Sequence, residues 1–213
     1  MMARVLIADD HAVVRAGLKQ FLVEDRSIRE VGEAATGQQT LDRLRAGGWD
    51  LLILDINMPD RSGLDILKHV RSGFPDTRIL VLSGFPERQY ALNVLRAGAS
   101  GYLAKDSAAE ELMKAVHTIL QGRRYVSATL AELLVSDIDG DGERPIHAQL
   151  SEREFQIFCK LAGGMPVSKI AAELFLSEST VKTHVSAIMM KMQVPSRLKA
   201  VVRAYELGLV APL

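Results

Sequence analysis

The N-terminal part of the chain repeats one pattern five times: a short aliphatic run, then a segment with apolar residues at helical spacing. The clearest run spans residues 51–54 and is followed at once by Asp55. An aliphatic run without polar interruption is typical of a strand buried on both faces. Strands that alternate with helices through short connections form a parallel sheet covered on both sides. We therefore expect a doubly wound α/β domain around a five-stranded parallel sheet.

The same pattern gives the expected elements. The strands lie at residues 4–10, 29–34, 50–56, 78–84 and 101–105. The helices lie at residues 12–24, 36–48, 62–73, 86–98 and 107–122. The predicted helix at 36–48 ends on Gly47 and Gly48, and the one at 86–98 ends on Gly98. Glycine suits the left-handed conformation that often ends a helix.

The remainder of the chain is different in character. Residues 123–135 favour one further short helix, and the stretch up to residue 147 is rich in Gly, Pro and acidic residues. Beyond it the pattern is purely helical, at residues 151–164, 166–175, 177–192 and 196–208. We therefore expect an α/β domain at 1–122, a linker with a short helix at 123–147, and an all-α domain at 148–213.

The acidic linker invites a second interpretation. Asp137, Asp139 and Asp141 have the spacing that begins a calcium-binding EF-hand loop. That loop needs a ligand at its ninth position, often through water, and a bidentate Glu at its twelfth, where this chain has Pro145 and Ala148. A solvated linker explains the residues better.

Composition excludes several classes of protein. The single cysteine, Cys159, rules out an internal disulfide and a Cys-based zinc site, and we expect it to be a small core residue. No apolar run approaches the ~18 residues of a membrane helix, and the N-terminus does not read as a signal peptide. We expect a cytoplasmic protein with no membrane partner.

Charge is unevenly distributed although the chain is neutral overall. Residues 1–147 carry 18 basic and 21 acidic side chains, a net charge of −3. Residues 148–213 carry 8 basic and 5 acidic side chains, a net charge of +3. Three charges in either direction do not exclude chance, so the imbalance gains meaning only if the basic half contains a phosphate-binding motif.

Five polar residues end the predicted strands: Asp9, Asp10, Asp55, Ser83 and Lys105. The carboxyl ends of parallel strands share one edge of the sheet, where ligands bind. Three carboxylates gathered there repel one another unless a cation joins them, and oxygen-only ligands favour Mg²⁺. One carboxylate is then free to attack a phosphoryl group, which an ammonium and a hydroxyl would stabilise.

Each of these residues also has a simpler interpretation. An Asp after a strand is often a turn residue or a helix cap, and Ser83 and Gly84 form an ordinary turn pair. Lys105 precedes Asp106 and Ser107, either of which is suited to cap the next helix. These interpretations do not explain why five polar groups gather on one edge of one sheet.

Residues 1–120 resemble the receiver domain of bacterial two-component response regulators, a CheY-like and flavodoxin-like fold. The resemblance rests on the acidic pair, the Asp-Ile-Asn-Met-Pro loop at 55–59, Ser83 and Lys105. It implies that Asp55 accepts phosphate from a sensor histidine kinase. It also implies that Asp10, Asp55 and the backbone carbonyl of Asn57 hold Mg²⁺, with Asp9 assisting.

The resemblance extends to a switch. Ser83 would follow the phosphate, and Tyr102 would match an aromatic side chain that swings inward on activation. Tyr102 also has an ordinary interpretation as a core residue or a dimer contact. Gly84 is small, as access to the phosphate requires, and Phe85 departs from the family pattern because it places bulk beside that glycine.

The helical domain contains a helix, a short turn and a second helix. Ser151 and Glu154 have the spacing of a capping box, and Ser177 is suited to cap the second helix. That helix has a predicted buried stripe and an opposite polar face. The stripe comprises Val181, Val185, Ile188 and Met192. Taken alone, these features fit a plain helical bundle as well as a DNA-binding motif.

The sequence between residues 150 and 192 resembles the LuxR-type helix-turn-helix output domain. The resemblance rests on the segments LSERE, IA, LFLSESTVKTHV and KM, in that order. Together with a receiver it resembles a response regulator of the NarL/FixJ subfamily. The resemblance implies base contacts by Lys182, Thr183 and Ser186. It implies phosphate contacts by Thr180, Lys191 and Arg197. We expect His184 to pack against the turn or the backbone rather than bind a metal.

The final helix offers an apolar stripe that packs on its own domain or against a second copy: Leu198, Val201, Val202 and Tyr205. The resemblance implies a homodimer on phosphorylation, a two-fold-related DNA operator and contact with RNA polymerase.

Three hypotheses of function follow. The first is a phosphorylation-controlled DNA-binding transcription regulator. The second is a phosphotransferase or phosphatase that forms an aspartyl phosphate, and the third is a DNA-binding regulator independent of phosphorylation. A haloacid-dehalogenase-like phosphatase needs an acid two residues after its nucleophile, where this chain has Asn57. We therefore expect no enzyme beyond Mg²⁺-dependent self-phosphorylation from a phosphodonor and slow self-dephosphorylation.

Overall fold

The computed structural model describes residues 2–58, 60–61, 63–84, 87–105, 107, 109–132 and 149–206. The chain divides into two compact units, Met1–Ile138 and Asp139–Leu213, and each is described by itself. Most of the predicted linker, with its EF-hand-like acids, lies outside the described residues, so the predicted domain boundaries stay predictions. No helix among the described residues is both long enough and apolar enough to cross a membrane.

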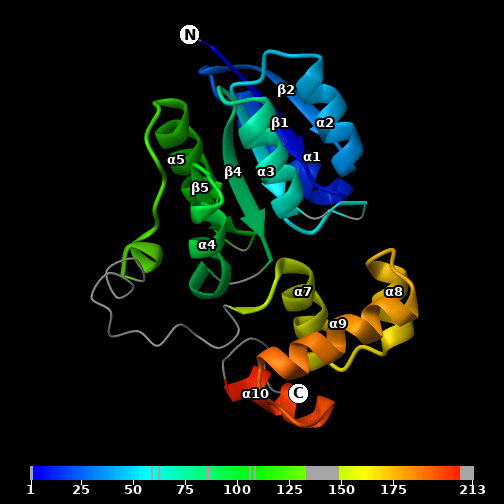
Figure 1. Cartoon of the computed structure of the whole chain (residues 1–213). Helices are drawn as coiled ribbons and strands as arrows, with labels where there is room; N and C mark the ends of the chain where they lie inside the picture. The colour runs from blue at the N-terminus through cyan, green and yellow to red at the C-terminus, as the bar shows by residue number, and fades with distance from the viewer. Residues whose placement is uncertain are drawn as a thin grey trace. The chain divides into compact units, whose positions relative to one another are not determined.

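The first unit is a five-stranded parallel sheet with helices on both faces, as predicted (Figure 1). Its strand order is β2-β1-β3-β4-β5. The strands are β1 (Ala3–Ala8), β2 (Ile28–Ala34), β3 (Leu51–Asp55), β4 (Arg78–Ser83) and β5 (Gly101–Ala104). The helices are α1 (Ala12–Glu24), α2 (Gly37–Arg45), α3 (Gly63–Gly73), α4 (Glu87–Arg96) and α5 (Ala109–Leu120).

The central strands are buried on both faces, which is why their sequences are aliphatic throughout. Every residue of β3 is buried. Alternate strand residues such as Val5, Ile7 and Ile53 form one cluster with Leu22 of α1 and Val116 of α5. Each aliphatic side chain fully buried in this way contributes roughly 1.5–3 kcal/mol to folding. The packing fixes the register of the strands and therefore the position of the residues at their ends.

The secondary-structure elements described in the second unit are all helices, as predicted. Its helices are α7 (Glu152–Ala162), α8 (Val167–Glu173), α9 (Glu178–Lys191) and α10 (Arg197–Glu206). The capping box of Ser151 and Glu154 is confirmed, because each side chain accepts from the other's backbone N–H. Ser177 caps α9 by accepting from the N–H of Thr180 at 3.1 Å. The predicted apolar stripe of α9 is buried.

Candidate functional site

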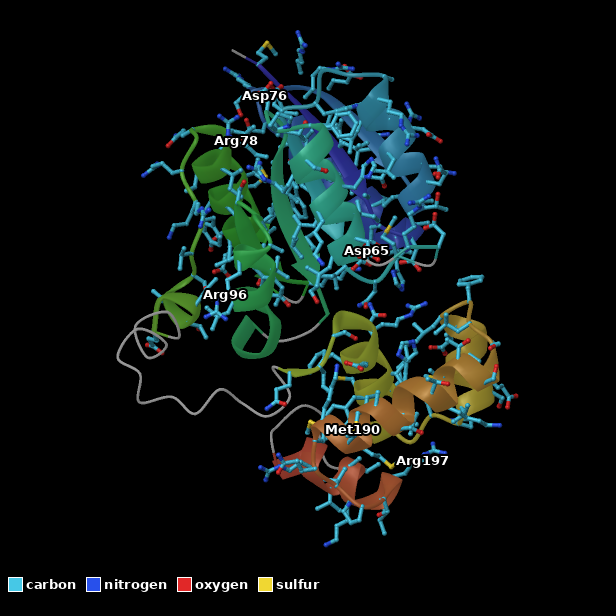
Figure 2. The ribbon with its side chains drawn as sticks, in the orientation of Figure 1. Asp65, Asp76, Arg78, Arg96, Met190 and Arg197 are labelled. Carbon is cyan, nitrogen blue, oxygen red and sulfur yellow. The ribbon has the colours of Figure 1, made fainter. Side chains whose placement is uncertain are left out.

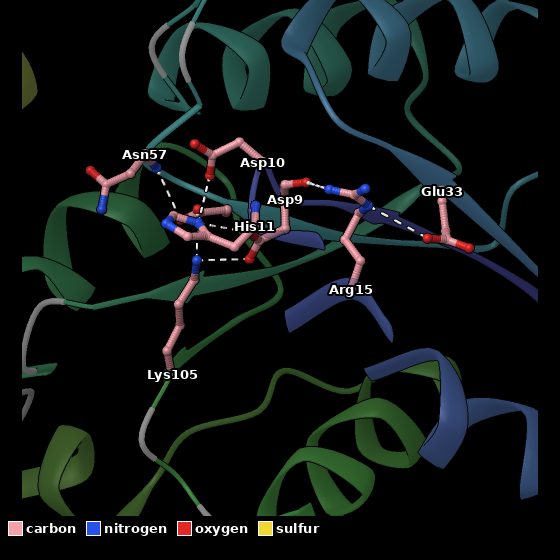
Figure 3. A network of polar contacts seen from close by, with 8 residues as sticks. Asp9, Asp10, His11, Arg15, Glu33, Asn57 and Lys105 are labelled. Atoms are coloured by element: carbon pink, nitrogen blue, oxygen red, sulfur yellow. Dashed lines mark hydrogen bonds and ion pairs between the residues drawn. The ribbon is translucent and has the colours of Figure 1, made fainter. Parts of the chain in front are cut away.

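The polar residues predicted at the strand ends meet at the carboxyl edge of the sheet (Figure 3). In the register, Ala8 lies opposite Leu54, so Asp9 and Asp55 leave β1 and β3 at the same level. The Nζ atom of Lys105 lies 2.7 Å from Asp55 Oδ2 and 2.7 Å from Asp9 Oδ2. One ligand atom from each of Asp9, Asp10, His11 and Asp55 lies within 4.8 Å of the others. The predicted gathering of the three acids is confirmed.

Asp55 is fully buried beside a cation. Its Oδ1 accepts a hydrogen bond of 3.0 Å from the backbone N–H of Asn57. Burial raises the pKa of Asp55, although the Lys105 ammonium opposes that effect. Burial alone would lower the pKa of Lys105, but the carboxylates of Asp55 and Asp9 outweigh it and raise the pKa. The site therefore holds a poorly solvated carboxylate next to a firmly charged ammonium.

The cluster has the ligands and the charge for a divalent cation. Three carboxylates gather around one ammonium, so the site carries an excess of negative charge. Asp9 Oδ2 is buried and accepts no well-directed hydrogen bond, although the Lys105 ammonium is close. Carboxylate oxygens are the ligands that hard dications prefer. The residues present fit Mg²⁺ or a similar ion.

The remaining predicted receiver residues lie around this edge. Ser83 ends β4 and is buried, and its backbone carbonyl accepts from the N–H of Lys105 at 2.8 Å. Asn57 is half-buried in the loop after β3. Tyr102 is fully buried in β5, whereas Phe85 lies outside the described residues. The roles predicted for these side chains stay predictions.

Two residues of the site were missing from the sequence prediction. His11 lies among the acids, with Nδ1 2.7 Å from Asp10 Oδ1 and 3.2 Å from Asp9 Oδ1. Arg15 of α1 donates from Nη1 to the backbone carbonyl of Asp9 at 2.7 Å, and its Nε lies 3.5 Å from Glu33 Oε2 on β2. Arg15 therefore joins the end of β1 to β2. A histidine directly after two acids was the available signal.

In the second unit, α9 presents the polar face that the sequence predicted. Lys182, Thr183 and Ser186 are exposed. The hydroxyls of Thr183 and Ser186 donate to backbone carbonyls one turn earlier, each at 3.1 Å, and so remain available as acceptors. Lys182 lies 3.7 Å from Glu178, a loose exposed pair that competes weakly with other anions.

The predicted phosphate contacts occupy different surroundings. Thr180 is half-buried at the N-terminus of α9, and its Oγ1 lies 2.8 Å from Ser177 Oγ. Arg197 is exposed at the start of α10 (Figure 2). Lys191 is already paired, because its Nζ lies 2.6 Å from Glu154 Oε2. The side chain of Glu154 is only 8% exposed, so Lys191 neutralises a buried acid, and its phosphate contact stays a prediction.

We expect Lys191→Met to destabilise the second unit by about 2 kcal/mol, because Glu154 would be left buried without its cation. The Lys191 ammonium and the Ser151 N–H hold the pKa of Glu154 below its usual value, despite burial, which acts in the opposite direction. Urea unfolding would measure the loss. The double variant Lys191→Met, Glu154→Gln should recover part of it, and equal stability of the single variant and the unmodified protein would contradict the pairing.

The sequence assigned inert roles to two further residues, Cys159 and His184. Cys159 is mostly buried, and burial raises the pKa of its thiol to about 12. A thiol with so high a pKa is a poor nucleophile and a poor redox sensor. His184 is half-buried, and its predicted packing against the turn or the backbone stays a prediction.

A doubly wound sheet with an acid cluster and a lysine at its carboxyl edge, joined to a helix-turn-helix unit, defines a receiver domain with a DNA-binding output domain. Residues 5–117 match the response regulator receiver domain family. Residues 148–204 match the bacterial regulatory proteins of the luxR family. The chain belongs to the two-component response regulators of the NarL/FixJ subfamily.

Relatives of known sequence and structure agree with this placement. The chain is 36% identical over 208 residues to the uncharacterized transcriptional regulatory protein YhcZ of Bacillus subtilis, covering 97% of each chain. It is 36% identical to the nitrate/nitrite response regulator protein NarL of Escherichia coli, covering 96% of this chain and 95% of NarL. The structure of RcsB from Salmonella enterica serovar Typhimurium bound to promoter rprA with the phosphomimetic BeF3⁻ is similar with a TM-score of 0.68 and 27% identity. That match covers 95% of this chain and 98% of RcsB.

Proposed function

We propose that phosphorylation of Asp55 by a sensor histidine kinase controls dimerisation and sequence-specific DNA binding by this response regulator, and thereby transcription. The observation that carries the proposal is the contact between buried Asp55 and Lys105 within the acid cluster. That arrangement supplies a carboxylate nucleophile and a cation for the charge of a phosphoryl group.

The chemistry proposed for the site is transfer of one phosphoryl group. A carboxylate oxygen of Asp55 attacks phosphorus, a new O–P bond forms, and the bond to the donor's leaving group breaks with its electron pair. Lys105, 2.7 Å from Asp55, and the hydroxyl of Ser83 would stabilise the charge on the transferred group. Mg²⁺, when held by Asp10, Asp55 and the Asn57 carbonyl with Asp9 assisting, would supply further charge neutralisation.

Hydrolysis of the aspartyl phosphate should be slow. The residue two positions after Asp55 is Asn57, whose amide cannot act as a general base to remove a proton from the attacking water. We therefore propose no enzymatic activity beyond self-phosphorylation from a small phosphodonor and slow self-dephosphorylation.

We propose that α10 forms part of a homodimer on DNA. Leu198 is 73% exposed and Val202 is 42% exposed, one turn apart on the same helix, whereas Ala200 and Ala204 are buried. Two exposed aliphatic side chains at this spacing suit a self-complementary two-fold contact. A dimer would place two copies of α9 on a two-fold-related operator. The structure of RcsB bound to promoter rprA supports DNA binding by this chain. RNA polymerase would be a further partner in the cytoplasm.

We expect Lys182→Ala to weaken DNA binding by about 1–3 kcal/mol, because α9 would lose an exposed cation at the groove. Titration of a selected DNA site by fluorescence anisotropy would measure the change. Lys114→Ala, which removes the same charge from an exposed position on α5 in the other unit, is the matched control. Equal affinities of both variants and the unmodified protein would contradict the predicted recognition helix.

The decisive test of the function is selection of binding sites from random DNA, with and without acetyl phosphate and Mg²⁺. We expect one two-fold-related sequence to be enriched, and to be bound more tightly with the phosphodonor. Failure to enrich any sequence would refute the DNA-binding role. Equal enrichment in both conditions would refute control by phosphorylation.

A further inference from the structure

We propose that a pocket at the amino edge of the sheet binds a small organic anion, namely a phosphate monoester or a carboxylate with an apolar body. The pocket has a volume of about 770 Å³. Sites for small molecules occupy roughly 300–1,000 Å³, so the pocket is large enough for such a ligand. Binding there would give the receiver domain an input that is separate from phosphorylation of Asp55.

The pocket lies where the strands begin, at the edge of the sheet opposite to the acid cluster. Among its lining residues, Ala3 starts β1, Arg78 starts β4 and Asp50 directly precedes β3. Figure 2 shows Arg78 at the end of the first unit that lies away from Asp65, in the first turn of α3. The five residues of β3 separate the two edges by roughly 16 Å. The pocket is therefore a different site from the one that holds the acids.

Two guanidinium groups in the lining are available to a ligand. Arg29 of β2 is exposed, and Arg78 of β4 is half-buried. Neither side chain makes a hydrogen bond or an ion pair with another residue in the part of the chain that the structure describes. Each guanidinium offers five N–H donors and no acceptor, so the group that satisfies these donors must be an acceptor and is best an anion.

The acids near the pocket are already bound by the protein itself. Asp50 Oδ2 accepts from the backbone N–H of Arg4 at 2.7 Å. Asp25 Oδ1 accepts from the N–H of Ser27 at 2.7 Å and from its hydroxyl at 2.5 Å. Asp25 Oδ2 lies 2.6 Å from Nε2 of His117 on α5. Because these carboxylates have partners of their own, the charge left for a ligand is that of the two arginines.

The rest of the lining describes the body of the ligand. Met2 and Leu120 contribute apolar side chains, and Met2 is 56% exposed. Apolar surface of this kind favours a ligand that covers it. Guanidinium groups bind phosphate and carboxylate oxygens through paired hydrogen bonds. An anionic group joined to a small apolar body therefore fits both parts of the pocket.

The test is a nuclear magnetic resonance titration of the full chain, without Mg²⁺ or a phosphodonor. Phenyl phosphate and benzoate are the two anionic probes, and benzylamine is a probe of the same apolar body with a positive charge. Arg78→Gln removes one guanidinium from the pocket. Arg26→Gln removes the same charge from an exposed position in the turn before β2 that does not line the pocket, and it is the matched control.

We expect the amide signals of Ser27, Arg29 and Gln121 to shift with phenyl phosphate, with benzoate or with both, but not with benzylamine. The probe that binds more tightly identifies the anionic group that the pocket prefers. Arg78→Gln should weaken binding about 10-fold, because a hydrogen bond to a charged group is lost. Arg26→Gln should bind as the unmodified protein does.

Three results would overturn the proposal. The first is that neither anion shifts these signals in the unmodified protein, which decides the matter even if Arg78→Gln does not fold. The second is that benzylamine shifts them as strongly as the anions do. The third is equal affinity of a folded Arg78→Gln variant and Arg26→Gln. The assay uses no phosphodonor, so its outcome is independent of whether Asp55 accepts phosphate.

Discussion

Replacing Asp55 with Asn is expected to lower the rate of labelling by acetyl phosphate in the presence of Mg²⁺ by a factor of about 10³ or more, which abolishes detectable labelling. The amide of Asn has no anionic oxygen with which to attack phosphorus. Mass spectrometry of the intact chain, or migration on phosphate-binding gels, would measure the labelled fraction. Asp76→Asn removes an exposed carboxylate between α3 and β4 (Figure 2) and should label normally. Labelling of Asp55→Asn at the unmodified level would refute the assignment.

The same substitution has a second expected effect, on stability without metal. Burial raises the pKa of Asp55 in the folded state above its ordinary value of 3.8, so the folded state binds more protons than the unfolded state between those two values. Stability of the unmodified protein should therefore fall as the pH rises through that interval. Asn carries no charge to bury, so the variant should melt at a higher temperature near neutral pH. The difference should shrink as the pH approaches about 4, and melting curves across that range would show it.

The features that the sequence predicted well are those with short-range or topological causes. Aliphatic runs of strand length predicted β1, β3 and β4, and parallel pairing then required Asp9, Asp55 and Lys105 to share one edge. Capping depends on residues three positions apart, so the capping box at Ser151 was also predictable.

The features that the sequence did not predict depend on side chains from separate elements. Lys191 and Glu154 are 37 positions apart, and each already had a local interpretation, so nothing indicated that they form an ion pair. The contacts of Arg15 depend on the angle at which α1 leaves β1. That angle is set by packing of the whole unit rather than by spacing along the chain.

Gly63→Ala is expected to destabilise the first unit by about 1–3 kcal/mol, because the first turn of α3, where Gly63 lies, has no space for a methyl group. A Cβ at Gly63 would lie 2.5 Å from the Cα of Ile56 and 2.7 Å from its carbonyl oxygen. Both are backbone atoms that cannot rotate away. The hydrogen bond of 3.2 Å from Gly63 N–H to the Ile56 carbonyl would be strained as well. Urea unfolding and melting temperature would measure the loss.

Gly63→Ala should also reduce phosphoryl uptake. Ile56 joins Asp55 to Asn57, and the clash with the new methyl group would push this segment away from α3. Gly73→Ala is the matched control: it lies at the other end of α3, and its Cβ would meet no atom within 4 Å. We expect that variant to be as stable as the unmodified protein or slightly more so, by less than about 1 kcal/mol, since Ala favours helix more than Gly does. Equal behaviour of the two variants would mean that the segment after Asp55 tolerates movement, and that close packing on α3 does not position the acceptor.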